Sequence, residues 1–156
     1  MDQESLRLSL LEFVSKAPAH VDAKKSFNNI KSENRHKKVE NFSHTIWEEL
    51  EHLRIAQEDI LRYMLIPDWE SPKWPEGYWP LEREILSDEE WEKSLTGFFD
   101  DLKEVQEFVK LSEIDLTAKM PHTKNHTYLR EILLIIDHNA YHLGKIVEMR
   151  KALNNW

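Results

Sequence analysis

The chain contains no cysteine, only 3 glycines and no apolar run long enough to cross a bilayer. Without cysteine there is no disulfide framework, no thiolate metal site and no cysteine nucleophile. A membrane-spanning helix needs about 20 consecutive apolar residues, so none is predicted. The N-terminus starts with acidic and polar residues and lacks the apolar core of a signal peptide. The expected location is therefore the cytoplasm.

Positive charge is also in short supply, since the 156 residues carry a formal net charge of −8. An acidic surface repels phosphate backbones, so no nucleic-acid partner is expected. The length predicts one domain over residues 1–156. One basic cluster occurs early in the chain, and we interpret it as a solvated connection between helices: Lys24, Lys25, Lys31, Arg35, Lys37 and Lys38.

The sequence does contain the patterns of long amphipathic helices. Scarce glycine, with abundant leucine, glutamate and lysine, favours helix over tight turns. Ser87 and Glu90 form the clearest start signal, a capping box before a regular apolar stripe. The predicted fold is therefore all-α, a four-helix bundle. The expected helices are residues 3–16 (Leu6, Leu10, Phe13 and Val14 on one face), a Ser43 N-cap to about 65, 87–109 and 127–153, with a short charged piece at 21–31.

A segment rich in proline and tryptophan separates the second and third predicted long helices. Residues 67–80 contain 4 prolines, which forbid a regular helix, and 3 tryptophans, which favour packing over exposure to water. We predict a packed loop that crosses one end of the bundle, as an apolar plug or a dimer contact. The alternative is a lid that keeps water out of a site.

The most informative residues are His138 and His142, four apart in the last predicted helix. This spacing places both imidazoles on one face, about 6 Å apart at Cβ. They interrupt a second apolar stripe that includes Ile135 and Ile146, so they should be largely buried. Buried imidazoles need polar partners, and one shared metal ion would satisfy a nitrogen of each. The alternative is two core histidines that hydrogen-bond with carbonyl or carboxylate groups.

A metal on two histidines needs a third protein ligand. His52 is the candidate left by elimination, because it is the remaining histidine in the middle of a predicted helix. On a helical wheel it falls roughly 130° from the centre of that helix's main apolar stripe, so periodicity alone makes it a flank residue. The other histidines lie in connections or at helix starts: His20, His36, His44, His122 and His126.

Three separated segments of the chain resemble the DinB-like superfamily, the damage-inducible, YfiT-related group of bacterial four-helix-bundle proteins. They are residues 50–57 (LEHLRIAQ), 74–80 (WPEGYWP) and 129–144, and the resemblance covers nearly the whole chain. Members of that family typically hold one divalent metal on three histidines, one from the second helix and an H-x3-H pair from the last. The resemblance therefore implies one divalent ion (Zn, Ni, Fe or Mn) with these ligands: His52, His138 and His142.

The resemblance also implies a class of function. Characterised relatives include thiol-dependent enzymes, such as bacillithiol S-transferases and a mycothiol-dependent isomerase, and family members are often dimers. We therefore expect a metal-dependent transferase or hydrolase, with a thiol-dependent S-transferase-type reaction as the leading hypothesis. The expected partners are a small-molecule substrate, a low-molecular-weight thiol and a second copy in a homodimer. The alternative is a non-catalytic metal- or ligand-binding bundle that acts in a stress response.

Catalytic groups are harder to identify. Asn139 replaces the glutamate of the H-E-x-x-H metalloprotease motif, so the base for peptide hydrolysis is absent. Glu131 lies two turns before the histidine pair and either orients a ligand or acts as a base. The alternative is a glutamate in the first helical turn that is there only because the helix dipole favours it. Asp59, on the same face as the predicted third ligand, has the same alternatives. Tyr141 is a candidate hydrogen-bond donor to a substrate, or a packing residue.

Overall fold

The computed structural model describes residues 2–81 and 87–156. The described residues fold into α-helices and short 3-10 helices, which confirms the predicted all-α class. None of the described helices combines the length and the apolar character needed to cross a membrane. The elements are α1 (Gln3–Lys16), α2 (Ala23–Phe27), η1 (Ser32–Asn34), α3 (Ile46–Leu65), η2 (Glu76–Tyr78), α4 (Asp88–Lys110) and α5 (Tyr128–Ala152).

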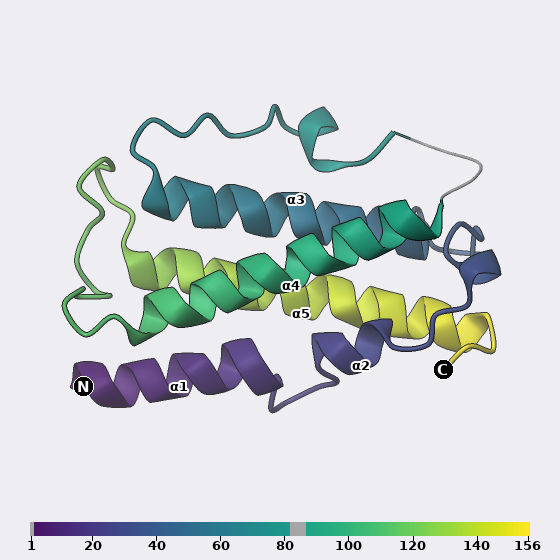
Figure 1. Cartoon of the computed structure of the whole chain (residues 1–156), viewed down its shortest axis with the longest axis horizontal. Coiled ribbons are helices and arrows are strands. Elements are labelled where there is room, and N and C mark those ends of the chain that lie inside the picture. The colour runs from purple at the N-terminus through teal and green to yellow at the C-terminus, as the bar shows by residue number, and fades with distance from the viewer. Residues whose placement is uncertain (1, 82–86) are drawn as a thin grey trace.

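The four long helices lie side by side in a bundle (Figure 1). α3 packs against both α4 and α5, and α1 packs mainly against α4. α2 follows α1 in the same direction and lies beside the second half of α5 (Figure 1). The two helices that carry the predicted metal ligands, α3 and α5, are therefore direct neighbours.

Side-chain caps fix where the helices begin. Ser87 accepts the backbone N–H of Glu90, and the Glu90 carboxylate accepts the backbone N–H of Ser87, which confirms the predicted capping box. The start of α3 was predicted wrongly, because Thr45 is its N-cap in place of Ser43. Thr45 and Glu48 form a second capping box, which satisfies two backbone N–H groups and sets the helix start.

The segment between α1 and α3 is less helical than predicted. The piece expected over residues 21–31 shortens to α2, and Asn29, two residues after the helix end, adopts a left-handed φ of 57°. Asp22 caps α2 by accepting the backbone N–H of Lys25. Phe27, at the end of α2, is buried in the core and fixes this segment against the bundle.

The apolar core forms two clusters along the bundle. One joins α1 to the other long helices through residues such as Leu10 and Val14. The other lies among α2, α3, α4 and α5 and includes Leu53 and Phe98. The predicted face of α1 is partly wrong, since Phe13 is 49% exposed. α1 buries only a narrow stripe, and Phe13 lies at its edge.

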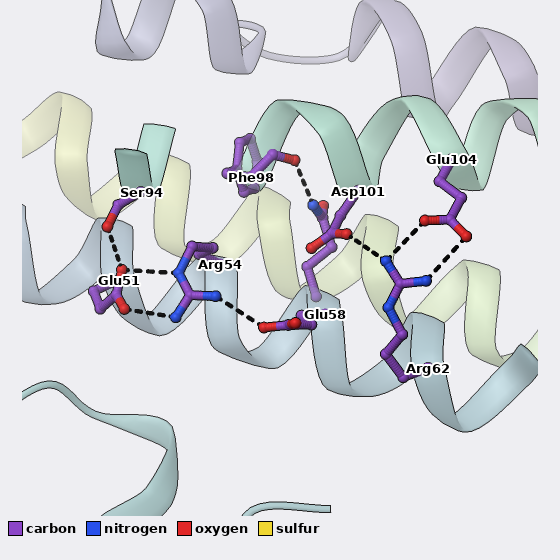
Figure 2. Close-up of polar contacts among 9 residues, drawn as sticks. Glu51, Arg54, Glu58, Arg62, Ser94, Phe98, Asp101 and Glu104 are labelled. Atoms are coloured by element: carbon purple, nitrogen blue, oxygen red, sulfur yellow. Dashed lines mark hydrogen bonds and ion pairs between the residues drawn. The ribbon is translucent and has the colours of Figure 1, made fainter. Parts of the chain in front are cut away.

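A network of charged and polar side chains joins α3 to α4, as Figure 2 shows. Arg54 donates to both carboxylate oxygens of Glu51, and Arg62 reaches across to Asp101 at 2.9 Å. Each arginine therefore faces at least two carboxylates and makes charge-assisted hydrogen bonds. We call this set the α3–α4 network: Glu51, Arg54, Glu58, Arg62, Ser94, Asp101 and Glu104.

The loop rich in tryptophan and proline runs back along α3 (Figure 1). Its residues Trp69 and Tyr78 both donate hydrogen bonds to Asp59, in the second half of α3. The Tyr78 carbonyl oxygen lies 2.8 Å from His52 Nδ1, in the first half of α3. The prediction that the loop crosses one end of the bundle was therefore wrong, because hydrogen bonds with Asp59 and His52 hold the loop along the side of α3.

Candidate metal centre

His52 is buried, although periodicity made it a flank residue. Its exposed fraction is 3%. A helical wheel treats α3 in isolation, but α5 and the loop both cover this flank: His138 comes from α5, and Trp79 comes from the loop. The third ligand implied by the family resemblance therefore lies inside the protein, next to the pair on α5.

The structure brings the three predicted histidines together. His52 Nε2 lies 3.1 Å from His138 Nε2, and the ring centroid of His142 lies 4.5 Å from that of His52 and 4.4 Å from that of His138. One nitrogen from each ring lies within 4.8 Å of the others. Ligands bonded at about 2.0 Å to a tetrahedral ion are about 3.3 Å apart, so these spacings suit one metal. Among the described residues, this is the group of His, Asp and Glu side chains that fits an ion.

The electrostatics of the centre favour neutral imidazoles. Burial, together with the neighbouring His142 and His52, lowers the pKa of His138 to about 3. Burial also lowers the pKa of His52, against the opposing effect of its hydrogen bond with the Tyr78 carbonyl. A neutral imidazole offers a lone pair, which is the form that binds a metal.

Two of the three rings are held by partners on their outer nitrogens. His52 Nδ1–H donates to the Tyr78 carbonyl at 2.8 Å, and His142 Nδ1–H donates to Glu49 Oε2 at 2.5 Å. A ring that donates from Nδ1 has its lone pair on Nε2, so these contacts direct Nε2 of both rings as acceptors. Inward-facing lone pairs on His52 and His142 suit a shared cation, and this donor set fits Zn, Ni, Fe or Mn.

Glu49 is the functional residue that the sequence analysis missed. It is fully buried, and its carboxylate contacts His142, Lys145 and His44. Burial raises the pKa of Glu49, but the hydrogen bonds from His142 and Lys145 outweigh it, so the pKa lies below its ordinary value. The carboxylate therefore stays ionised and holds His142 in one orientation. A signal was present in the sequence: Glu49 occupies a position in the apolar stripe of α3, where a charge needs a partner.

Aromatic rings cover the centre on its outer side. The Trp79 ring stacks on His52 with a centroid distance of 3.9 Å and an interplanar angle of 4°. Its other face stacks on His44 at 3.7 Å. The loop therefore contributes one wall of the site. Trp79 is packed against the helices, as the packed-loop interpretation predicts, and it also covers His52, as the lid interpretation predicts.

The two catalytic candidates lie in different surroundings. The Glu131 carboxylate is buried, and it contacts Arg130 at 2.5 Å and His126 at 3.4 Å, at the loop before α5. Tyr141 is 66% exposed, with its ring edge against His142. Tyr141 is therefore an exposed neighbour of the centre, whereas the contacts of Glu131 lie at the start of α5. A catalytic role for either remains a prediction.

Comparison with known protein families decides the broader identity. A sequence model of the DinB superfamily matches residues 20–146, most of the chain. The chain belongs to the DinB superfamily. The matched part of this DinB protein contains α2 to α5 apart from the last turns of α5, and it includes all three clustered histidines. No curated protein and no solved structure matches the chain.

Proposed function

We propose that this DinB protein holds one divalent metal on His52, His138 and His142 and uses it in a thiol-dependent S-transferase-type reaction on a small molecule. The observation that carries the metal site is the cluster of three imidazoles, with His52 and His142 buried and His138 half-buried, in which one nitrogen of each ring lies within 4.8 Å of the others. The thiol, the substrate, a cytoplasmic location and a homodimer belong to the same proposal and are supported by membership of the family.

Three neutral ligands leave a divalent ion with its full charge. A bound ion of this kind supplies a positive centre that stabilises a thiolate at neutral pH. Glu49 holds His142 in place, and Trp79 shields His52 from water. In an S-transfer reaction the thiol loses its proton to solvent, its sulfur bonds to an electrophilic carbon, and a leaving group departs with the electron pair of the broken bond. The chain has no cysteine of its own to compete as the nucleophile.

A second candidate is a non-catalytic metal- or ligand-binding protein. One observation favours it: both oxygens of the Glu49 carboxylate are already engaged, one with His142 and the other with Lys145. Asp59, the other buried carboxylate on this side of α3, accepts hydrogen bonds from two loop residues. Carboxylates used in this way are poorly suited to take a proton from a substrate.

Metal content and thiol assays test these two candidates in sequence. Elemental analysis should find one divalent ion per chain, and His138→Ala should lose it while circular dichroism shows the helices retained. Folded wild-type protein that takes up no Zn, Ni, Fe or Mn would sink both candidates. Conjugation of electrophiles with bacillithiol, mycothiol, glutathione or coenzyme A would then support the enzyme, and metal-loaded protein with no turnover would favour the binding role.

A further inference from the structure

Asp59 joins the two ends of the loop to α3. It is 8% exposed. Its Oδ1 accepts the indole N–H of Trp69 at 2.8 Å, and its Oδ2 accepts the hydroxyl of Tyr78 at 2.7 Å. Each oxygen of one buried carboxylate therefore fixes a different part of the loop. A hydrogen bond from a neutral donor to a buried charge is worth more than one between neutral groups.

The loop next to Tyr78 is tightly folded, so a fixed side chain also fixes the backbone. Gly77 N–H donates to the Lys73 carbonyl at 2.7 Å, and Tyr78 N–H donates to the Pro75 carbonyl at 3.1 Å. A Cβ on Gly77 would lie 2.8 Å from the Pro72 Cβ, closer than carbon atoms approach without displacement. The turn that ends at Tyr78 therefore has little room to change shape.

Tyr78 holds a metal-ligand candidate through its other polar group. Its hydroxyl donates to Asp59, and its backbone carbonyl accepts Nδ1–H of His52 at 2.8 Å. Burial raises the pKa of the Tyr78 hydroxyl to about 12, and Asp59 acts in the same direction, so the hydroxyl remains a donor. The contacts form a closed path from α3 to the loop and back to α3, and Trp79, the next residue, stacks on the His52 ring.

We propose that Asp59 is a positioning residue of the metal centre: it fixes the Tyr78 carbonyl, which in turn holds His52 in the tautomer and orientation that present Nε2 to the ion. This inference rests on the proposed metal site. Loss of an acceptor behind a metal-bound histidine typically weakens metal binding by about 10- to 100-fold. Asp59→Asn keeps the shape of the side chain but removes its charge and replaces one acceptor oxygen with an N–H donor. The Tyr78 hydroxyl then loses the charge-assisted hydrogen bond that it donates to the carboxylate.

Metal affinity is the first measurement. Chelator competition with Zn²⁺ should show the Kd of Asp59→Asn raised about 10-fold or more over wild type. Asp101→Asn is the matched control, because it removes the charge of a carboxylate that pairs with Arg62 in the α3–α4 network. Its Kd should equal that of wild type. Tyr78→Phe, which retains Asp59 and the backbone carbonyl, should weaken binding in the same direction, and it serves as the test if Asp59→Asn does not fold.

The tautomer of His52 separates a positioning role from a purely structural one. In metal-free wild type, the imidazole nitrogen NMR shifts of His52 should report the Nδ1–H form, and Asp59→Asn or Tyr78→Phe should show a mixture with the Nε2–H form. An unchanged tautomer, or unchanged Zn²⁺ affinity in both variants, overturns the inference. Wild type that binds no metal overturns the proposed site, and an intact dependence of the tautomer on Asp59 would then restrict the inference to the orientation of His52.

Discussion

α3 contributes to two polar clusters that differ in how their charges are arranged. On the side facing α4, the α3–α4 network pairs each arginine with carboxylates of opposite charge, as Figure 2 shows for Arg54 and Arg62. On the side facing α5, His52 Nε2 and His138 Nε2 face each other at 3.1 Å. Every arginine of the α3–α4 network is paired with carboxylates, whereas Nε2 of His52 and Nε2 of His142 are acceptors that face a common point.

The pKa directions express the same difference. The hydrogen bonds that Arg54 donates to Glu51 raise the pKa of Arg54, so its neighbours stabilise the charged form. Burial lowers the pKa of His138, and its histidine neighbours reinforce the shift, so its surroundings exclude the charged form. The paired charges of the α3–α4 network join two helices. The histidine cluster disfavours the protonated form of His138 and brings several nitrogen lone pairs together, which suits a metal ion.

The largest expected effect is the loss of a ligand. His138→Ala leaves two histidines, so we expect the Kd for Zn²⁺ to rise by more than about 100-fold, beyond the loss caused by removing a ligand's hydrogen-bond partner. Isothermal titration calorimetry checks this. The result would contradict the assigned site if the variant bound one Zn²⁺ per chain with wild-type affinity.

Acid should destabilise the metal-free protein through the same residue. The pKa of His138 is about 3 in the folded protein, against an ordinary value of 6.5. Between these values the unfolded chain binds a proton that the folded chain excludes, so the free energy of unfolding falls as the pH drops below 6.5. The slope contributed by one such group reaches about 1.4 kcal/mol per pH unit.

Urea titrations of metal-free protein between pH 7.5 and 5 measure that slope. Carboxylates also titrate toward the lower end of this range, so His138→Gln provides the comparison. Its free energy of unfolding should depend less steeply on pH than that of wild type. Equal slopes for the two proteins would show that His138 is not held neutral by its surroundings.

The partner of His142 should matter less than a ligand but should still be measurable. Glu49→Gln keeps the shape of the side chain and removes the charge that orients the ring, so we expect a metal affinity about 10- to 100-fold weaker. Glu51→Gln is the control two residues away, since Glu51 belongs to the α3–α4 network. Similar losses of metal affinity in the two variants would mean that a general change in α3, and not contact with His142, is responsible.

The smallest effect is expected in the α3–α4 network. Arg62→Met removes ion pairs with Asp101 and Glu104 that are partly open to water, so the free energy of unfolding should fall by about 1 kcal/mol, and by less at high salt. Metal affinity should not change. If Arg62→Met also weakened Zn²⁺ binding, the two clusters on α3 would not be energetically independent.

The helices could be predicted because their signals are local. The capping box at Ser87 and the apolar periodicity after it involve neighbouring residues only, and α4 begins where they indicate. The N-cap of α3 was misplaced because Ser43 and Thr45 are both suitable caps. Only the reciprocal contact of Glu48 distinguishes them.

The centre could be predicted only in part, because burial at a helix flank depends on what packs there. Nothing in the periodicity of α3 indicates that α5 and Trp79 cover His52, and the family resemblance supplied that ligand. Glu49 was overlooked because a helical wheel shows it only as a polar residue within an apolar stripe. A charged residue at such a position is buried and therefore needs a buried partner. The path of the loop depends on Asp59, a contact between distant positions that no local pattern reveals.

The clustered histidines have a consequence for how the chain holds together. His52 and His138 are 86 residues apart in sequence, and a cysteine-free chain has no disulfide to connect such distant segments. An ion bound by both would cross-link the bundle reversibly, closing a loop that contains α4. The melting temperature would then rise with the free metal concentration and fall on addition of a chelator. Resistance to unfolding would thus depend on how much metal the surroundings supply.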